Sequence, residues 1–113
     1  MLNYSINEIE GVKVLVMSGS LTADTSETFK SLVKQVTERE SLIINFENVT
    51  LITSAGMNAL VDVSFFAKEH EKRVIILWPE KELLKMAETL GVYNYLIFAQ
   101  SIDEAKMKIK FFT

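Results

Sequence analysis

Two continuous apolar runs constrain the fold more than any other feature of this chain. The segments "SLIINF" (41–46) and "RVIILW" (73–78) are rich in β-branched residues and show no alternation of polar and apolar positions. Such runs are typical of strands that are buried on both faces of a parallel sheet. The intervening stretch 55–72 contains no proline and presents a wide apolar face, which predicts an embedded helix. A strand, a crossover helix and a second strand therefore form the centre of the predicted fold.

The N-terminal residues predict a β-hairpin. Alternating polar and apolar residues in about 3–9 and 12–18 predict two antiparallel strands that meet at the turn dipeptide Glu10-Gly11. Gly19 is expected to end the second strand. The following segment, 22–39, repeats apolar residues at helical spacing and predicts an amphipathic helix.

The remaining segments continue the alternation of strand and helix. We expect 47–52 to be a short connection, 80–90 and 101–112 to be helices, and 94–99 to be a final short strand. The order is therefore β-β-α-β-α-β-α-β-α. It predicts one α/β domain over residues 1–113, with a mixed, mostly parallel sheet and helices packed on it.

Composition and charge exclude several classes of function. The 113 residues carry a net charge of −3, spread without a basic stripe, so nucleic acid is not an expected partner. The absence of cysteine excludes disulfides, thiolate metal sites and a cysteine nucleophile. The N-terminus lacks the pattern of a secretory signal, and no apolar run approaches the roughly 20 residues needed to span a membrane. We therefore expect a cytoplasmic protein without membrane insertion.

No motif in the chain predicts an enzyme. The glycine-rich turn of dinucleotide-binding folds and the GxxxxGK[ST] phosphate loop are both missing from the sequence. The single histidine, His70, has no evident nucleophile partner and no neighbouring set of metal ligands. We therefore expect no catalytic residue, no metal site and no cofactor.

The stretch "LITSAGM" (51–57) is the strongest candidate for a functional site. It places Thr53 and Ser54 between a strand and a helix that is expected to begin near Ala55. From that position the hydroxyl of Ser54 would cap the first turn, and Gly56 would let another backbone segment approach closely. Capping is a structural role, and the residues alone leave open whether the hydroxyl also undergoes chemistry.

Around this stretch the chain resembles the STAS family, the sulfate-transporter and anti-sigma-factor-antagonist domain. The segments "INFENVTLITSAGMNALVDV" (44–63) and "SGSLTADTSETF" (18–29) carry the resemblance, which extends over about residues 4–110. It implies a STAS-like fold and the function of a stand-alone bacterial anti-sigma factor antagonist. Such a protein binds a serine-kinase anti-sigma factor with a histidine-kinase-like ATPase fold. Phosphorylation by that kinase ends the interaction, and a PP2C-type phosphatase restores it.

The resemblance also implies which residue is phosphorylated. By position in the motif the acceptor is Ser54, with Thr53 as the alternative. The family has acidic residues where this chain has Thr53 and Asn45. Both changes remove a negative charge that we expect near Ser54, which would make a phosphate easier to hold.

A docking surface for the partner is expected around Ser54. The loop Ser20–Asp24 also follows a strand and enters a helix, so it should lie at the same end of the sheet. Asp24 or Thr25 is expected to cap that helix. The expected partner-binding residues are Ser20, Leu21, Thr22, Asp24, Thr53, Ala55, Gly56, Met57 and Asn58.

Two other functions stay open at this stage. In a constitutive STAS adaptor the phosphorylation switch would be lost, as the changes at Thr53 and Asn45 suggest, and Ser54→Glu would bind the same partner as the wild type. A nucleotide or small-molecule sensor is the other alternative, because some family members are reported to bind nucleotides. The chain contains no phosphate loop that would support it.

Overall fold

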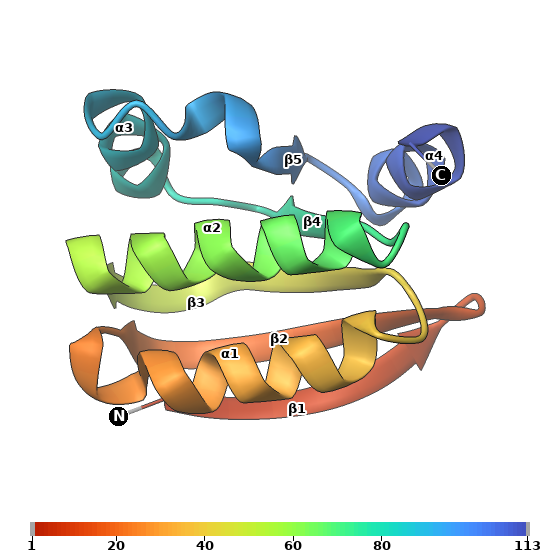
Figure 1. Ribbon diagram of the computed structural model, residues 1–113, viewed down its shortest axis with the longest axis horizontal. Helices are drawn as coiled ribbons and strands as arrows, with labels where there is room; N and C mark the ends of the chain where they lie inside the picture. The colour runs from red at the N-terminus through yellow and green to blue at the C-terminus, as the bar shows by residue number, and fades with distance from the viewer. Residues whose placement is uncertain (1, 113) are drawn as a thin grey trace.

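The computed structural model describes residues 2–112 (Figure 1). Within this range five strands form one sheet in the order β1-β2-β3-β4-β5, in which β1 is antiparallel to β2 and the other neighbours are parallel. The elements are β1 Leu2–Ile9, β2 Val12–Leu21, α1 Ala23–Thr37, β3 Leu42–Ile52, α2 Ser54–Glu69, β4 Val74–Leu77, α3 Lys81–Thr89, β5 Ile97–Ala99 and α4 Ile102–Phe112. This confirms the predicted α/β fold with its mixed, mostly parallel sheet. The predicted domain, 1–113, includes residues 1 and 113, which lie outside the described residues.

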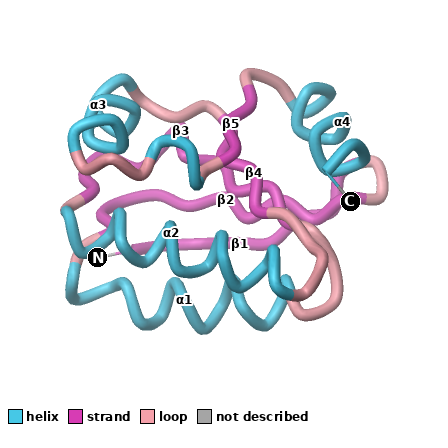
Figure 2. The backbone as a smooth tube through the Cα atoms, turned by 45° about the horizontal axis from the view of Figure 1, so that its top comes forward, coloured by secondary structure: helices cyan, strands magenta, loops and turns pink. Residues whose placement is uncertain are grey.

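The helices cover the two faces of the sheet unequally (Figures 1 and 2). α1, α2 and α3 contribute to one large cluster of buried side chains, which includes Leu15, Ile44 and Ile76 of the sheet. On the opposite face α4 packs through Ala105 against a smaller cluster that includes Ile43. Successive side chains of a strand point to opposite faces, so a strand covered on both sides is apolar throughout. This explains the two continuous apolar runs of the sequence.

β2 and β3 are both longer than predicted. Gly19, at φ 103°, lies within β2, which continues to Leu21. Residues 47–52, expected as a connection, belong to β3. The register between the two strands shifts after Val16 and again after Gly19. Each irregularity interrupts the alternation of buried and exposed residues while the pairing itself continues, and this made both strands look shorter in the sequence.

Turns elsewhere follow the predictions more closely. Glu10 (φ 51°) and Gly11 (φ 84°) form the two-residue turn of the β1–β2 hairpin, in which both residues adopt positive φ. Gly91, with φ 73°, follows α3 as expected for the C-terminal end of a helix. The final strand is shorter than the expected 94–99, because Tyr93–Tyr95 forms a 3-10 turn before β5.

Ion pairs join the two central helices. Lys30 and Lys34 of α1 approach the Asp62 carboxylate of α2 at 3.8 and 3.2 Å. Lys30 also pairs with Glu27 at 3.0 Å, and this hydrogen bond raises the pKa of Lys30 above its ordinary value. Such exposed pairs contribute little stability each, so α1 and α2 are held together mainly by their buried apolar faces.

Candidate functional site

The carboxyl ends of β2 and β3 bring the two predicted loops together. Leu21 pairs with Ile52 at the end of the parallel ladder. The N–H of Thr53 then donates a hydrogen bond to the Leu21 carbonyl at 3.1 Å. The segments that enter α1 and α2 therefore leave the sheet at the same end, the carboxyl-terminal end of the parallel strands, on the left of Figure 1. The expectation that both loops share one end of the sheet is confirmed.

Gly56 lies where the start of α2 packs tightly against the end of β2. It is buried, and a Cβ atom at this position would lie 2.2 Å from the Leu21 carbonyl oxygen. That separation is shorter than any that real Cβ atoms show, so a side chain would force the helix away from the strand. The glycine thus permits the close approach that holds the start of α2 against the sheet.

Thr53, and not Ser54, caps α2. The Oγ1 atom of Thr53 accepts a hydrogen bond from the N–H of Gly56 at 3.3 Å, and its carbonyl accepts one from the N–H of Met57 at 2.8 Å. Thr53 has extended backbone angles (φ −100°, ψ 175°), whereas Ser54 is the first helical residue. The prediction that Ser54 caps the helix is therefore wrong by one residue. Both residue types suit the cap position, and only the backbone conformation distinguishes them.

The hydroxyl of Ser54 is left without a role in the fold. Ser54 is exposed, and its hydroxyl makes no hydrogen bond with any residue in the range 2–112. The first turn of α2 contains no acidic residue. Because a helix N-terminus carries a partial positive charge, a negative group on Ser54 would be stabilised there.

The predicted docking residues divide by exposure. Asp24, Ser54 and Asn58 are exposed, while Ser20, Thr22, Thr53 and Ala55 are half-buried. Leu21, Gly56 and Met57 are buried, and Leu21 and Met57 belong to the large apolar cluster. The contact of these three with a partner stays a prediction, and their burial means that the exposed residues around them would make most of that contact. They lie beneath the exposed residues of the predicted docking surface.

A pair of threonines fixes the loop before α1. The Oγ1 atom of Thr25 accepts a hydrogen bond from the N–H of Thr22 at 2.9 Å and donates one to the carbonyl of Ser20 at 3.0 Å. Thr22 is the N-cap of α1, so the prediction that Asp24 or Thr25 would cap this helix is wrong. Asp24 lies in the first turn, where its carboxylate is exposed beside the positive helix end.

Asn45 lies too far from Ser54 to change the charge around it directly. β3 continues from Asn45 to Ile52 before the site begins. At about 3.3 Å per residue this stretch spans on the order of 20 Å, well beyond a Debye length of about 8 Å. The Asn45 side chain instead accepts a hydrogen bond from the N–H of Glu47 at 2.8 Å. We expected the replacement of an acidic residue at both positions to remove a negative charge near Ser54. This is wrong for Asn45, which is distant, whereas Thr53 directly precedes Ser54.

The sequence prediction misses an apolar surface at the end of β3, a few residues before Ser54. Leu51, at the end of β3, is 52% exposed. It borders a cavity of about 250 Å³ between β3 and the start of α3, which is also lined by Phe46, Val49, Thr50, Ile52, Glu80, Glu82, Leu83 and Met86. The sequence feature that could have indicated this surface is Leu51, an apolar residue within the segment 47–52 that was expected to be a connection.

The imidazole of His70 contacts a residue of its own helix. Nδ1 of His70 lies 2.9 Å from the carbonyl oxygen of Phe66, and the two rings stack with centroids 4.2 Å apart. Residues 2–112 contain no group of three or more histidine, aspartate or glutamate side chains placed to hold a metal ion. Over the same range, none of the helices combines the length and apolar character that a membrane crossing requires.

Several solved structures share this fold. An anti-sigma factor antagonist from Mycobacterium paratuberculosis is 16% identical with a TM-score of 0.79, over 97% of this chain and 95% of that chain. The phosphorylated form of the Bacillus cell fate determinant SpoIIAA is 17% identical with a TM-score of 0.68, over 95% and 99% of the two chains. The murine anion transporter Slc26a9 is 20% identical with a TM-score of 0.76, over 92% of this chain but only 18% of the transporter. At these identities the likeness establishes the fold.

The family follows from the sequence match. The model of the STAS domain matches residues 3–105. This chain therefore belongs to the STAS domain family, as the resemblance in its motifs implied. No curated protein matches it in sequence.

Proposed function

We propose that this protein is a non-enzymatic regulatory module that binds a serine-kinase anti-sigma factor and is released when Ser54 is phosphorylated. The observation that carries the proposal is the exposed Ser54 hydroxyl at the first residue of α2. Its STAS family membership supports the proposal, as does a fold shared with anti-sigma factor antagonists, among them SpoIIAA, which is solved in unphosphorylated and phosphorylated forms. We place the interaction in the cytoplasm, where the kinase has ATP.

In this proposal the chemistry at Ser54 is done by the partners. The kinase transfers the γ-phosphoryl group of ATP to Ser54 Oγ, with release of ADP and the hydroxyl proton. A PP2C-type phosphatase hydrolyses the phosphate ester and restores the serine. This chain has to present the hydroxyl to each active site, and the exposure of Ser54 allows that.

A phosphate on Ser54 would affect binding far more than folding. It adds about −1.5 to −2 charges. The N-terminus of α2 favours a nearby negative charge by about 0.3–1 kcal/mol, and Thr53 maintains the cap in both states. A partner that covers Ser54 would have to remove water from the phosphate, which is strongly unfavourable unless cations meet it. Phosphorylation would thereby separate the two proteins while the antagonist stays folded.

The phosphorylation state of the protein in its own cells tests the proposal. Measurement of intact mass followed by peptide mapping should find one phosphate on Ser54 that is absent from Ser54→Ala. Ser101→Ala is the matched control, because Ser101 is also exposed at the start of a helix. Purified kinase should bind the wild type and should fail to bind Ser54→Glu.

Other outcomes would change the assigned phosphorylation site or the proposed function. Phosphate on Thr53 would move the switch by one residue. A protein that stays unmodified during growth and stress, together with equal binding of Ser54→Glu and wild type to one partner, would overturn the switch. The constitutive STAS adaptor would then be the better function.

A further inference from the structure

The second half of β3 has a free edge on the side of β4. The two strands pair only from Leu42 to Asn45 of β3, and the last residue of β4, Leu77, lies opposite Asn45. β3 continues to Ile52 and pairs there with β2 alone. Successive residues of a strand direct their N–H and C=O groups to opposite neighbours, so part of the 46–52 backbone is turned toward the side where β4 has ended. No described strand pairs with it on that side.

The cavity beside Leu51 runs along this free edge. Its volume is about 250 Å³, and it lies between the second half of β3 and the start of α3, which are both on the left of Figure 1. Its apolar lining consists of Phe46, Val49, Leu51, Ile52, Leu83 and Met86. An extended peptide can add as a further strand where a sheet edge is free, and a pocket beside the edge then selects its side chains.

Two carboxylates give the cavity a negative charge. Glu80 precedes α3 and Glu82 lies in its first turn, and both side chains line the cavity and are exposed. Neither forms an ion pair with another described residue. None of the described lysine or arginine side chains lines the cavity. An occupant therefore meets negative charge that the fold leaves uncompensated, and this favours a segment with lysine or arginine.

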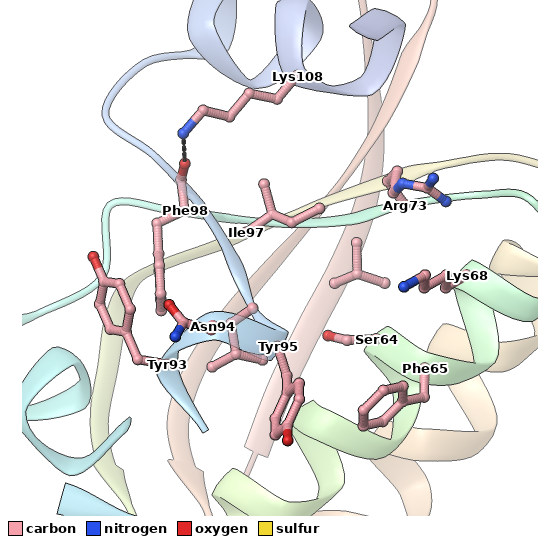
Figure 3. A pocket seen from close by; sticks show the side chains of 12 residues that line it. Ser64, Phe65, Lys68, Arg73, Tyr93, Asn94, Tyr95, Ile97, Phe98 and Lys108 are labelled. Carbon is pink, nitrogen blue, oxygen red and sulfur yellow. Dashed lines mark hydrogen bonds between the residues drawn. The ribbon is translucent and has the colours of Figure 1, made fainter. Parts of the chain in front are cut away.

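The sheet edge at β5 differs in both respects. β5 spans only Ile97–Ala99, and the ammonium group of Lys108 donates a hydrogen bond to the Phe98 carbonyl (Figure 3). Short edge strands and lysine side chains are devices that prevent pairing with another chain. The larger cleft beside β5, about 500 Å³ between α2, Tyr93–Phe98 and α4, thus offers a further strand little backbone. Residues 46–52 contain no lysine, arginine or proline that would block pairing.

We propose that the free edge of β3 binds an extended peptide segment of a partner protein, one that combines aliphatic side chains with lysine or arginine. The segment adds to the second half of β3 as a further strand, and an aliphatic side chain enters the cavity between Leu51 and Met86. Its cations pair with Glu80 and Glu82. The lining alone would suit any aliphatic group, and the carboxylates any cation, but the free backbone selects an extended chain that brings both. The inference does not depend on phosphorylation of Ser54.

A phage library of random peptides, panned on the full-length protein, tests which segments the edge accepts. Enriched sequences should combine aliphatic residues with lysine or arginine and should contain little proline, which cannot donate to a strand ladder. The most enriched peptide is then synthesised and titrated into the ¹⁵N-labelled protein. Amide NMR spectra should show saturable shifts at residues 46–52 and at the start of α3.

Matched variants separate the apolar contact from the charge. Leu51→Ser should weaken binding of the synthetic peptide about tenfold, while Leu90→Ser, beyond the far end of α3, should bind as the wild type does. Glu80→Gln and Glu82→Gln combined should weaken binding about threefold or more at low ionic strength, and Glu88→Gln is the control. All five positions are exposed, so their replacement leaves the core intact, and dispersed amide spectra check the fold.

Methylation of the peptide's backbone nitrogens tests strand addition itself. Because successive residues direct their amides to opposite sides, N-methylation at alternate positions should weaken binding about fivefold or more, with little change at the positions between them. The proposal is overturned if panning enriches no such sequence, or if the Leu51 and Glu80/Glu82 variants bind as the wild type does. It is also overturned by equal effects of N-methylation at every position, or by shifts at Leu2–Ile9 of β1 in place of 46–52.

Discussion

At the scale of single residues, the neighbouring hydroxyl groups of Thr53 and Ser54 differ in whether the fold uses them. Thr53 uses its side chain to cap α2, and Ser54 leaves its side chain in solvent. A serine that capped the helix would lose that hydrogen-bond acceptor, or change it, on phosphorylation. With the cap one residue earlier, the fold and the proposed phosphorylation would not compete for one oxygen atom.

Removal of the cap should be measurable. Thr53→Ala should lower the free energy of unfolding by about 1 kcal/mol, because the N–H of Gly56 loses its acceptor. Thr53→Ser keeps the hydroxyl and should lose much less. Ser54→Ala is the matched control and should change stability by less than about 0.5 kcal/mol. Urea unfolding followed by circular dichroism compares the three, and equal losses in Thr53→Ala and Ser54→Ala would contradict the cap assignment.

The contact at Gly56 leads to a second prediction. Gly56→Ala places a Cβ atom 2.2 Å from the Leu21 carbonyl oxygen, so α2 has to move away from β2. We expect a loss of about 1–3 kcal/mol in unfolding free energy, the usual range for an overpacked site. Asn58→Ala, at an exposed position of the same helix, should be nearly neutral. An unfolding midpoint unchanged by Gly56→Ala would mean that the helix shifts freely at this end.

At the scale of elements, the chain shows which features a sequence pattern can predict. The central strands and the helices were predictable, because their burial on one or both faces leaves a regular period in the residues. The second half of β3 was not, because the register shifts break that period while the strand continues. The cap of α2 was placed one residue late for a different reason, since Thr53 and Ser54 have the same capping chemistry.

The candidate site was predictable only in outline. The motif located Ser54, and the order of strands placed it beside the Ser20–Asp24 loop. The burial of Leu21 and Met57 depends on how α2 packs on β2, which no local pattern records. The cleft beside β5 joins residues from α2, the Tyr93–Phe98 segment and α4, so it exists only in the folded chain.

The lengthened β3 ends in a surface that should contribute to partner binding. Leu51 is 52% exposed and lies three residues before Ser54. If the proposed kinase covers Ser54, Leu51→Asp should weaken its binding about tenfold or more, which corresponds to about 1.4 kcal/mol. Leu90→Asp is the matched control, because Leu90 is 43% exposed but follows the far end of α3. Calorimetric titration with the purified kinase measures both, and equal affinities would place Leu51 outside the interface.

At the scale of the whole molecule, charge at position 54 should separate stability from binding. Ser54→Asp puts a carboxylate at the positive end of α2, so the melting temperature should stay the same or rise by a few degrees. Binding to the kinase should be lost. Asn58→Asp, one turn further along α2, should have a smaller effect on both. A large fall in the melting temperature of Ser54→Asp would show that charge acts by unfolding the site.

The free hydroxyl of Ser54 has a consequence for how relatives of this chain can be read. Since folding draws nothing from that oxygen atom, a descendant that replaces the serine by alanine would fold as well as its ancestor. Retention of a serine at this position among relatives would therefore support the proposed interaction with another protein. The preceding position gives no such information, because a residue that caps α2 is useful there whether or not a partner binds. Substitutions at position 54 would therefore report on the proposed interaction with a partner, whereas substitutions at position 53 would report on the stability of the fold.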